Sequence, residues 1–132
     1  MSESLNEDQA LRTFVQQVQT RAGLASPQEA DVATRVTLRT LAEAVSGGQV
    51  DDLRASLPPE LQDELGQRSG QARQLDRAGF LDRASGEMLT TDQDAVQQQV
   101  RAVLATLREW APDREIEDTV RQLPTSIAEL FD

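Results

Sequence analysis

The sequence predicts an all-α protein of about eight helices, in which two tandem four-helix repeats pack as one pseudo-symmetric domain. Apolar residues recur at helical spacing along the chain, and no stretch alternates as a strand does. Shifting the first half by 66 residues places segment 34–44 on segment 100–110 and Phe14 on Phe80. A unit of that size buries little apolar surface alone, so we expect the two copies to share a core through their long second helices. The identical pairs in the long segments are Arg35 and Arg101, Leu38 and Leu104, Thr40 and Thr106, Leu41 and Leu107, and Glu43 and Glu109.

The repeats divide the chain into three parts. Residues 1–6 are polar and are expected to be disordered, residues 7–66 form the first helical repeat, and residues 67–132 form the second. The glycine-containing segment 66–70 is the expected connector.

The first repeat carries clear helix signals. Its first helix is expected to end at Gly23. Ser26 can cap the second helix, Pro27 suits the first helical position, and Glu29 completes a capping box. We expect the glycines at 47–48 to end that helix.

The second repeat follows the same plan with local changes. Gly79 is expected to interrupt its first helix, and Thr91, Asp92 and Asp94 to provide the cap of the long helix that follows. Ser126 and Glu129 are spaced as a further capping box before the last short helix.

The composition limits the available chemistry. The chain has a formal net charge of −10, which argues against nucleic-acid and anionic-membrane partners. It contains no Cys, His, Lys or Tyr, and all 13 basic residues are Arg. The usual general base, imidazole metal ligand and amine nucleophile are therefore missing, so we expect no enzyme activity, cofactor or metal. No signal peptide or membrane span is evident, which predicts a cytoplasmic protein.

Arg35 and Arg101 occupy matched positions, as do Asp52 and Asp118. The favoured interpretation is an ion pair within each repeat, with Asp31 supporting Arg35 at i,i+4. The alternative is that the two guanidinium groups bind an anionic small molecule.

Trp110 is the single tryptophan, and its counterpart in the first repeat is Ala44. A position that accepts alanine in one copy points to a gap filled between the copies or to an exposed interface anchor, and the first is favoured. Arg108 lies one turn or less away in sequence, so the two residues together are the best candidate partner contact.

Two motif-like stretches do not support a site. Asp92 and Asp94 begin like an EF-hand loop, but the required glycine and bidentate glutamate are absent. Segment 59–65 resembles a recognition helix but is acidic, which disfavours DNA binding.

The chain resembles the bacterial domain-of-unknown-function family 2267. The resemblance is carried by FVQQVQTRAGL (14–24), VATRVTLRTLAEAVSGGQ (32–49) and DLRASLPPELQDEL (52–65), and in the second copy by VRAVLATLREWAPDREIEDTVRQLP. It implies an all-helical tandem-repeat fold and no particular activity.

Together these observations predict a non-enzymatic protein-interaction or adaptor module, with self-association as one form of that interaction. The alternative is a binder of a small anionic ligand through the repeat-matched arginines. The candidate interface or ligand contacts are Trp110, Arg108, Arg35 and Arg101.

Overall fold

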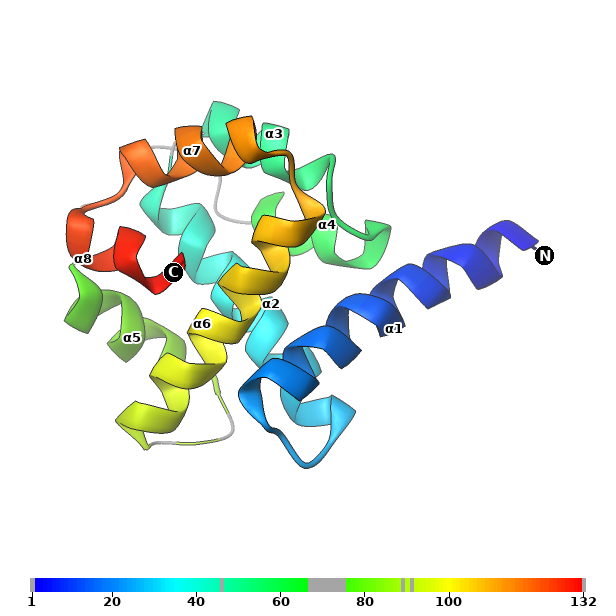
Figure 1. The fold of residues 1–132 in the computed structure, drawn as a ribbon, viewed down its shortest axis with the longest axis horizontal. Helices are drawn as coiled ribbons and strands as arrows, with labels where there is room; N and C mark the ends of the chain where they lie inside the picture. Colours follow the sequence, from blue (N-terminus) through cyan, green and yellow to red (C-terminus); the bar gives the residue numbers. More distant parts are fainter. Residues whose placement is uncertain (1, 46, 67–75, 89, 91, 132) are drawn as a thin grey trace.

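The computed structural model describes residues 2–45, 47–66, 76–88, 90 and 92–131, with backbone alone for 2–8, 47 and 66. Within these residues there are eight α-helices and a short 3-10 helix and no strand, so the predicted all-α class is confirmed (Figure 1). Residues 67–70 of the predicted connector lie outside the described residues. The elements are α1 (Ser2–Ala22), α2 (Pro27–Ala44), α3 (Gly47–Arg54), α4 (Pro59–Gly66), α5 (Arg77–Ser85), α6 (Gln93–Trp110), α7 (Asp113–Gln122), α8 (Thr125–Ala128) and η1 (Glu129–Phe131).

Helix α1 ends where the sequence predicted. Gly23 adopts a positive φ of 67°, which glycine reaches without steric cost. The Leu24 N–H then donates to the Gln19 carbonyl at 3.0 Å, which satisfies a free carbonyl of the last turn. The other end differs, because α1 begins at Ser2 and its backbone includes residues that the sequence assigned to a disordered end. This N-terminal part projects from the body of the protein (Figure 1).

The two long helices, α2 and α6, have the same length and start 66 positions apart. Ser26 Oγ accepts the Glu29 N–H at 3.3 Å, which confirms the predicted cap of α2. Asp92 Oδ1 accepts the Asp94 N–H at 3.0 Å, so Asp92 is the cap among the three residues expected to cap α6. Helix α2 packs against α6, and α1 packs against both (Figure 1). The pseudo-symmetric packing of two repeats stays a prediction.

Two glycine predictions were wrong. Helix α2 already ends at Ala44, and Val45 turns the chain in an extended conformation, so Gly47 opens α3 instead of ending α2. Gly79 lies in the first turn of α5 and does not interrupt it, because its N–H donates to the Asp76 N-cap at 2.7 Å.

The predicted capping box at Ser126 was also wrong. Helix α8 begins at Thr125, directly after Pro124, and has no side-chain cap. Ser126 Oγ instead accepts the Arg77 N–H at 3.2 Å, which joins α8 to the start of α5.

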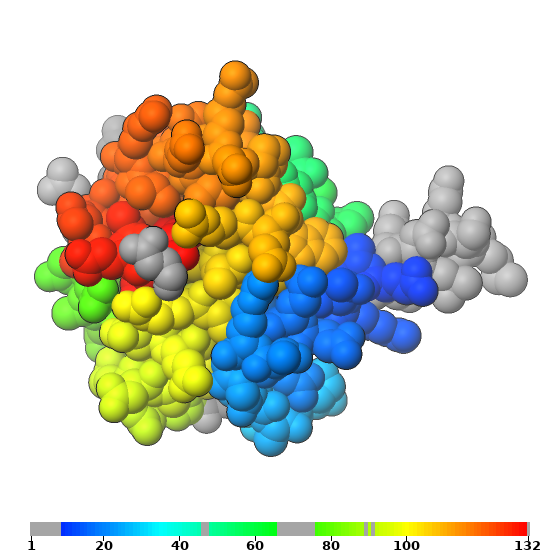
Figure 2. All heavy atoms as spheres, viewed as in Figure 1, coloured from blue at the N-terminus to red at the C-terminus, as the bar shows by residue number. Residues whose placement is uncertain are grey.

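One hydrophobic cluster runs through the protein and draws on both halves of the chain. Figure 2 shows atoms of α1 packed directly against those of α6, which lies far away in sequence. The largest fully buried side chains include Phe14, Leu38, Leu41 and Leu53 from the first half and Phe80, Leu104, Leu107 and Ile127 from the second.

Among the described residues, no helix combines the length and the apolar character needed to cross a bilayer.

Threonines on α2 test how buried hydroxyls affect stability. The Thr40 hydroxyl donates to the Val36 carbonyl at 2.8 Å, whereas the buried Thr37 hydroxyl has no partner within the described structure. An unsatisfied buried polar group costs about 1–3 kcal/mol. We therefore expect Thr37→Val to raise the free energy of unfolding by about 1 kcal/mol in urea titrations. Thr40→Val is the matched control and should leave stability unchanged or lower it; equal gains from both variants would contradict the assignment.

Candidate functional site

An open groove with a volume of about 610 Å³ lies between α1 and α2. Its apolar lining comes from Leu11 and Val15 on α1 and from Pro27 and Val32 on α2. Leu11 and Val15 are one helical turn apart and so lie on the same side of α1. Leu11 and Val32 are only partly buried, although both pack against the core. The groove thus leaves apolar side chains open to solvent.

The polar lining of the groove is mostly uncharged. Arg12 is exposed at the α1 edge and has no hydrogen bond or ion pair within the described residues. Asp31 lies on the α2 edge and is partly exposed. These two residues are the charged members, so the lining has no net charge. The remaining polar members are Gln16, Gln19 and Gln28.

Three of the four apolar groove residues have polar counterparts in the second half of the chain, whereas Val15 corresponds to Leu81. At the 66-residue offset, Leu11 corresponds to Arg77 and Val32 to Gln98. Arg77 Nε donates to the Ser126 carbonyl at 3.0 Å, and its Nη2 lies 3.1 Å from Glu129 Oε2. Gln98 is exposed. At Leu11 and Val32 the first half therefore carries apolar residues where the second half carries polar ones, and Arg77 is already hydrogen-bonded.

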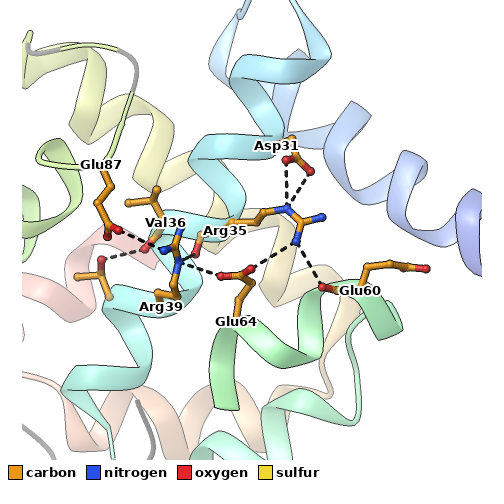
Figure 3. Close-up of polar contacts among 8 residues, drawn as sticks. Asp31, Arg35, Val36, Arg39, Glu60, Glu64 and Glu87 are labelled. Atoms are coloured by element: carbon orange, nitrogen blue, oxygen red, sulfur yellow. Dashed lines mark hydrogen bonds and ion pairs between the residues drawn. The ribbon is translucent and has the colours of Figure 1, made fainter. Parts of the chain in front are cut away.

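A charged network lies farther along α2, on the side that faces α4 (Figure 3). Arg35 Nε lies 3.1 Å and 3.2 Å from the two Asp31 oxygens, and its Nη1 is 3.3 Å from Glu64 Oε1. The same Nη1 reaches the Glu60 carbonyl at 3.5 Å, while the Glu60 carboxylate points away from Arg35 (Figure 3). The network fastens α2 to α4.

Arg39 continues this network toward the segment after α5. Arg39 Nε lies 2.8 Å from Glu64 Oε2. Its N–H, however, points toward the Arg35 carbonyl oxygen, 3.4 Å away. The contact with Glu64 is therefore an ion pair without an aligned hydrogen bond. Arg39 Nη1 lies 3.1 Å from Glu87 Oε1. The Glu64 side chain is only 12% exposed and stands between the two guanidinium groups.

The network keeps Arg35 charged. Burial by itself would lower the pKa of Arg35, but the hydrogen bonds and negative charges of Asp31 and Glu64 outweigh burial and raise the pKa above its ordinary value. The guanidinium group is therefore cationic at every physiological pH, and carboxylates of the chain itself surround it.

Two further ion pairs connect the first helix of each half to the long helix of the other half. Arg83 on α5 binds Glu43 on α2, with Nη2–Oε1 and Nε–Oε2 distances of 2.6 and 3.1 Å. This hydrogen bonding raises the pKa of Arg83. Arg21 on α1 binds Glu109 on α6. The two glutamates are identical residues at the 66-residue offset, so the same acidic position receives an arginine from the opposite half in both cases.

Trp110 lies where α6 meets α1. Its ring packs on Phe14 with centroids 5.3 Å apart and planes inclined by 58°, and its Nε1 donates to Gln17 Oε1 at 2.8 Å. The side chain is partly buried against the core. This placement agrees with the favoured interpretation of a residue that fills a gap between the halves.

The four candidate contacts do not form one site. Arg35 pairs with Asp31 and Glu64, so the expected pairing with Asp52 was wrong: Asp52 lies on α3, whereas Arg35 faces α4. Asp118 pairs with Arg121 at 3.3 Å. Arg101 is partly buried and has polar interactions of its own.

Arg108 is exposed and donates to the Phe131 carbonyl at 3.3 Å. It lines a separate crevice of about 320 Å³ between α7 and the C-terminal helices. No group of metal-binding side chains occurs among the described residues, and Asp92 serves as a helix cap.

Sequence reasoning missed the groove, Glu64 and Arg39. A residue-by-residue comparison at the 66-residue offset would have singled out Leu11 and Val32, because they correspond to Arg77 and Gln98. Arg39 follows Arg35 by one helical turn, which places both on one face of α2. Nothing in the local sequence indicates that α4 would deliver Glu64 between them.

The fold and these side chains define a small all-helical protein whose helix boundaries recur along the chain and whose first half bears an open apolar groove. The chain belongs to the family described as an uncharacterized conserved protein (DUF2267), whose family model matches residues 11–130. None of the curated proteins compared with the chain matches it significantly.

Replacing Glu64 tests the charged network. Glu64→Gln leaves two partly buried guanidinium groups without the carboxylate that they share. Removing one member of a buried ion pair destabilises the fold by more than the intact pair stabilises it, because the remaining charge is left uncompensated. We expect the free energy of unfolding in urea to fall by about 1–3 kcal/mol. Glu87→Gln is the matched control, because Glu87 is 44% exposed and binds only Arg39, so its loss should cost at most about 1 kcal/mol. A larger loss for Glu87→Gln would show that Glu64 is not the centre of the network.

Two substitutions separate the roles of the Trp110 ring and its N–H. Trp110→Phe keeps an aromatic ring against Phe14 but loses the hydrogen bond to Gln17, and should cost about 1 kcal/mol of unfolding free energy. Trp110→Ala also removes the ring contact and should cost about 2–4 kcal/mol. Far-UV circular dichroism in urea measures both, since fluorescence is lost with the tryptophan. If Trp110→Ala is neutral, the ring does not hold α1 to α6.

Proposed function

We propose that this protein is a protein-interaction module and that the α1–α2 groove is its docking surface for an amphipathic α-helix. The observation that carries the proposal is the presence of partly exposed apolar side chains at Leu11 and Val32, where the other half of the chain has Arg77 and Gln98. A soluble helix normally turns such residues toward a core, and an apolar groove with a polar rim is typical of helix-binding surfaces.

The shape and lining of the groove support a helical occupant. Two packed helices leave a long depression between them, and a third helix fits such a depression through residues spaced by one turn. Glutamine side chains at the rim can donate and accept hydrogen bonds, which suits the polar flanks of an incoming helix. Only Arg12 and Asp31 contribute charge.

The anionic-ligand alternative has less support at Arg35. Both Arg35 and its neighbour Arg39 already contact carboxylates of the chain, with Glu64 between them. An incoming anion would have to displace a partly buried carboxylate, and that carboxylate would then lose its own partners. The proposed module needs no catalytic group, and its cytoplasmic location stays a prediction from the sequence.

Site-specific photo-crosslinking in the host cell tests the proposal. A photoreactive residue in place of the exposed Gln16, which lines the groove, is compared with one in place of the exposed Gln98 on the polar second half. We expect protein crosslinks at position 16, mapping to a helix with apolar residues one turn apart, and few at position 98.

Leu11→Glu should lower the yield at position 16 by about tenfold, because a carboxylate buried without a partner opposes docking. Val120→Glu is the matched control, since Val120 is also a partly buried apolar residue but lies on α7. Equal yields at positions 16 and 98, or no effect of Leu11→Glu, would refute the docking surface.

A further inference from the structure

We infer that the occupant of the groove is the same α1–α2 hairpin of a second copy of this chain, so that the protein forms a two-fold homodimer. This inference rests on the proposed function and specifies its partner. It follows from three features of the groove: the absence of net charge in its lining, the positions of Arg12 and Asp31, and the positions of its apolar side chains.

The first feature is electrostatic. The chain carries a formal charge of −10, so most faces of two copies would repel each other. The groove lining contains one arginine and one aspartate and has no net charge. Two copies can therefore approach through this face without placing an excess of like charge in the interface.

The second feature is the placement of those two charges. Arg12 is on α1 and Asp31 is on α2, so the two charges come from the two different helices that line the groove. A two-fold axis in the plane of this face and midway between the two residues exchanges their positions, so each Arg12 would face Asp31 of the other copy. The arrangement forms two identical ion pairs from one pair of residues.

Both charged groups have capacity for this contact. Arg12 has no partner within the described structure. Asp31 is bound by Arg35 Nε, but its side chain is 38% exposed and a carboxylate accepts about four hydrogen bonds. An intermolecular Arg12–Asp31 pair would therefore add to the Asp31–Arg35 pair without replacing it.

The third feature is the apolar lining. The same axis that exchanges Arg12 and Asp31 brings Leu11 and Val32 of one copy over the groove of the other. Each copy then supplies both the groove and the side chains that fill it, as a two-fold interface requires. A partner of different sequence would need its own complementary charge pair, whereas a second copy already has it.

Sedimentation equilibrium over a concentration series up to roughly 1 mM tests the inference. The wild-type protein should pass from 14.5 kDa to twice that mass. Leu11→Glu and Arg12→Asp should each raise the dimer dissociation constant by at least about tenfold, since each change acts twice in a two-fold interface. Arg114→Asp is the matched control, because Arg114 is also exposed and unpaired among the described residues but lies on α7.

A charge exchange provides the decisive comparison. Asp31→Arg should weaken the dimer, and the Arg12→Asp, Asp31→Arg double variant should restore it at least about tenfold relative to Asp31→Arg alone. Both of these chains lack the internal Asp31–Arg35 pair, so the recovery isolates contact between positions 12 and 31. Circular dichroism confirms that each variant is folded.

The outcomes separate the inference from the proposed function. A monomer at every concentration, or a dimer that is insensitive to Leu11→Glu and the charge exchange, overturns the inference. If crosslinks at position 16 then reach a different protein and depend on Leu11, the proposed function stands without self-association. If no groove-dependent crosslink forms at all, both fail.

Discussion

The packing of α1, α2 and α6 against one another is the constraint on which the rest of the structure depends. The matched long helices α2 and α6 each carry an apolar face that a unit of half the chain would bury poorly. Leu38 and Leu41 of α2 lie in one cluster with Leu104 and Leu107 of α6, and α1 covers both helices. Thr106 of α6 donates to the Ala102 carbonyl at 2.8 Å, so a small polar side chain is buried there without an unpaired donor. Helix α4 packs against α2 and α1, and α5 packs against α6 and α2.

Arginine is the only basic residue type in the chain, and its several donors bind more than one acceptor at a time. Arg35 contacts Asp31 on its own helix, together with Glu64 and a backbone carbonyl on α4. Arg21 contacts Thr106 Oγ1 at 2.7 Å as well as Glu109. A lysine ammonium could not hold two separated acceptors in fixed geometry as a planar guanidinium does. The ion pairs therefore set how helices lie relative to one another, in addition to any gain in stability.

The sequence predicted what depends on near neighbours and failed where distant segments meet. Gly23, Ser26 and Asp92 were assigned correctly because a cap is decided within a few residues. Gly79 was misread because the Asp76 cap, which places it in a first turn, was overlooked. Ser126 was misread because its hydroxyl accepts a hydrogen bond from the backbone N–H of Arg77, 49 positions away in the sequence. The partner of Arg35 was wrong for the same reason, since the choice between Asp52 and Glu64 depends on how α4 packs on α2. The groove was missed for a different reason. Its residues lie on helices that the sequence predicted, but the periodicity of apolar residues does not show which of them stay partly exposed.

The difference between the two halves explains how an open apolar surface can exist without weakening the fold. In the second half, Arg77 joins α5 to the C-terminal helices through hydrogen bonds with Ser126 and Glu129. In the first half, the equivalent Leu11 can make no such bonds, and α1 is instead held by Phe14 and Val18, which are fully buried. The residues that line the groove are thus mostly distinct from those that hold α1 in place. Leaving apolar surface in water costs about 25 cal/mol per Å². This cost applies to the groove, while the buried residues of α1, such as Phe14 and Val18, stabilise the core. Substitutions at Leu11 or Val32 are therefore expected to change the surface of the groove more than the stability of the fold.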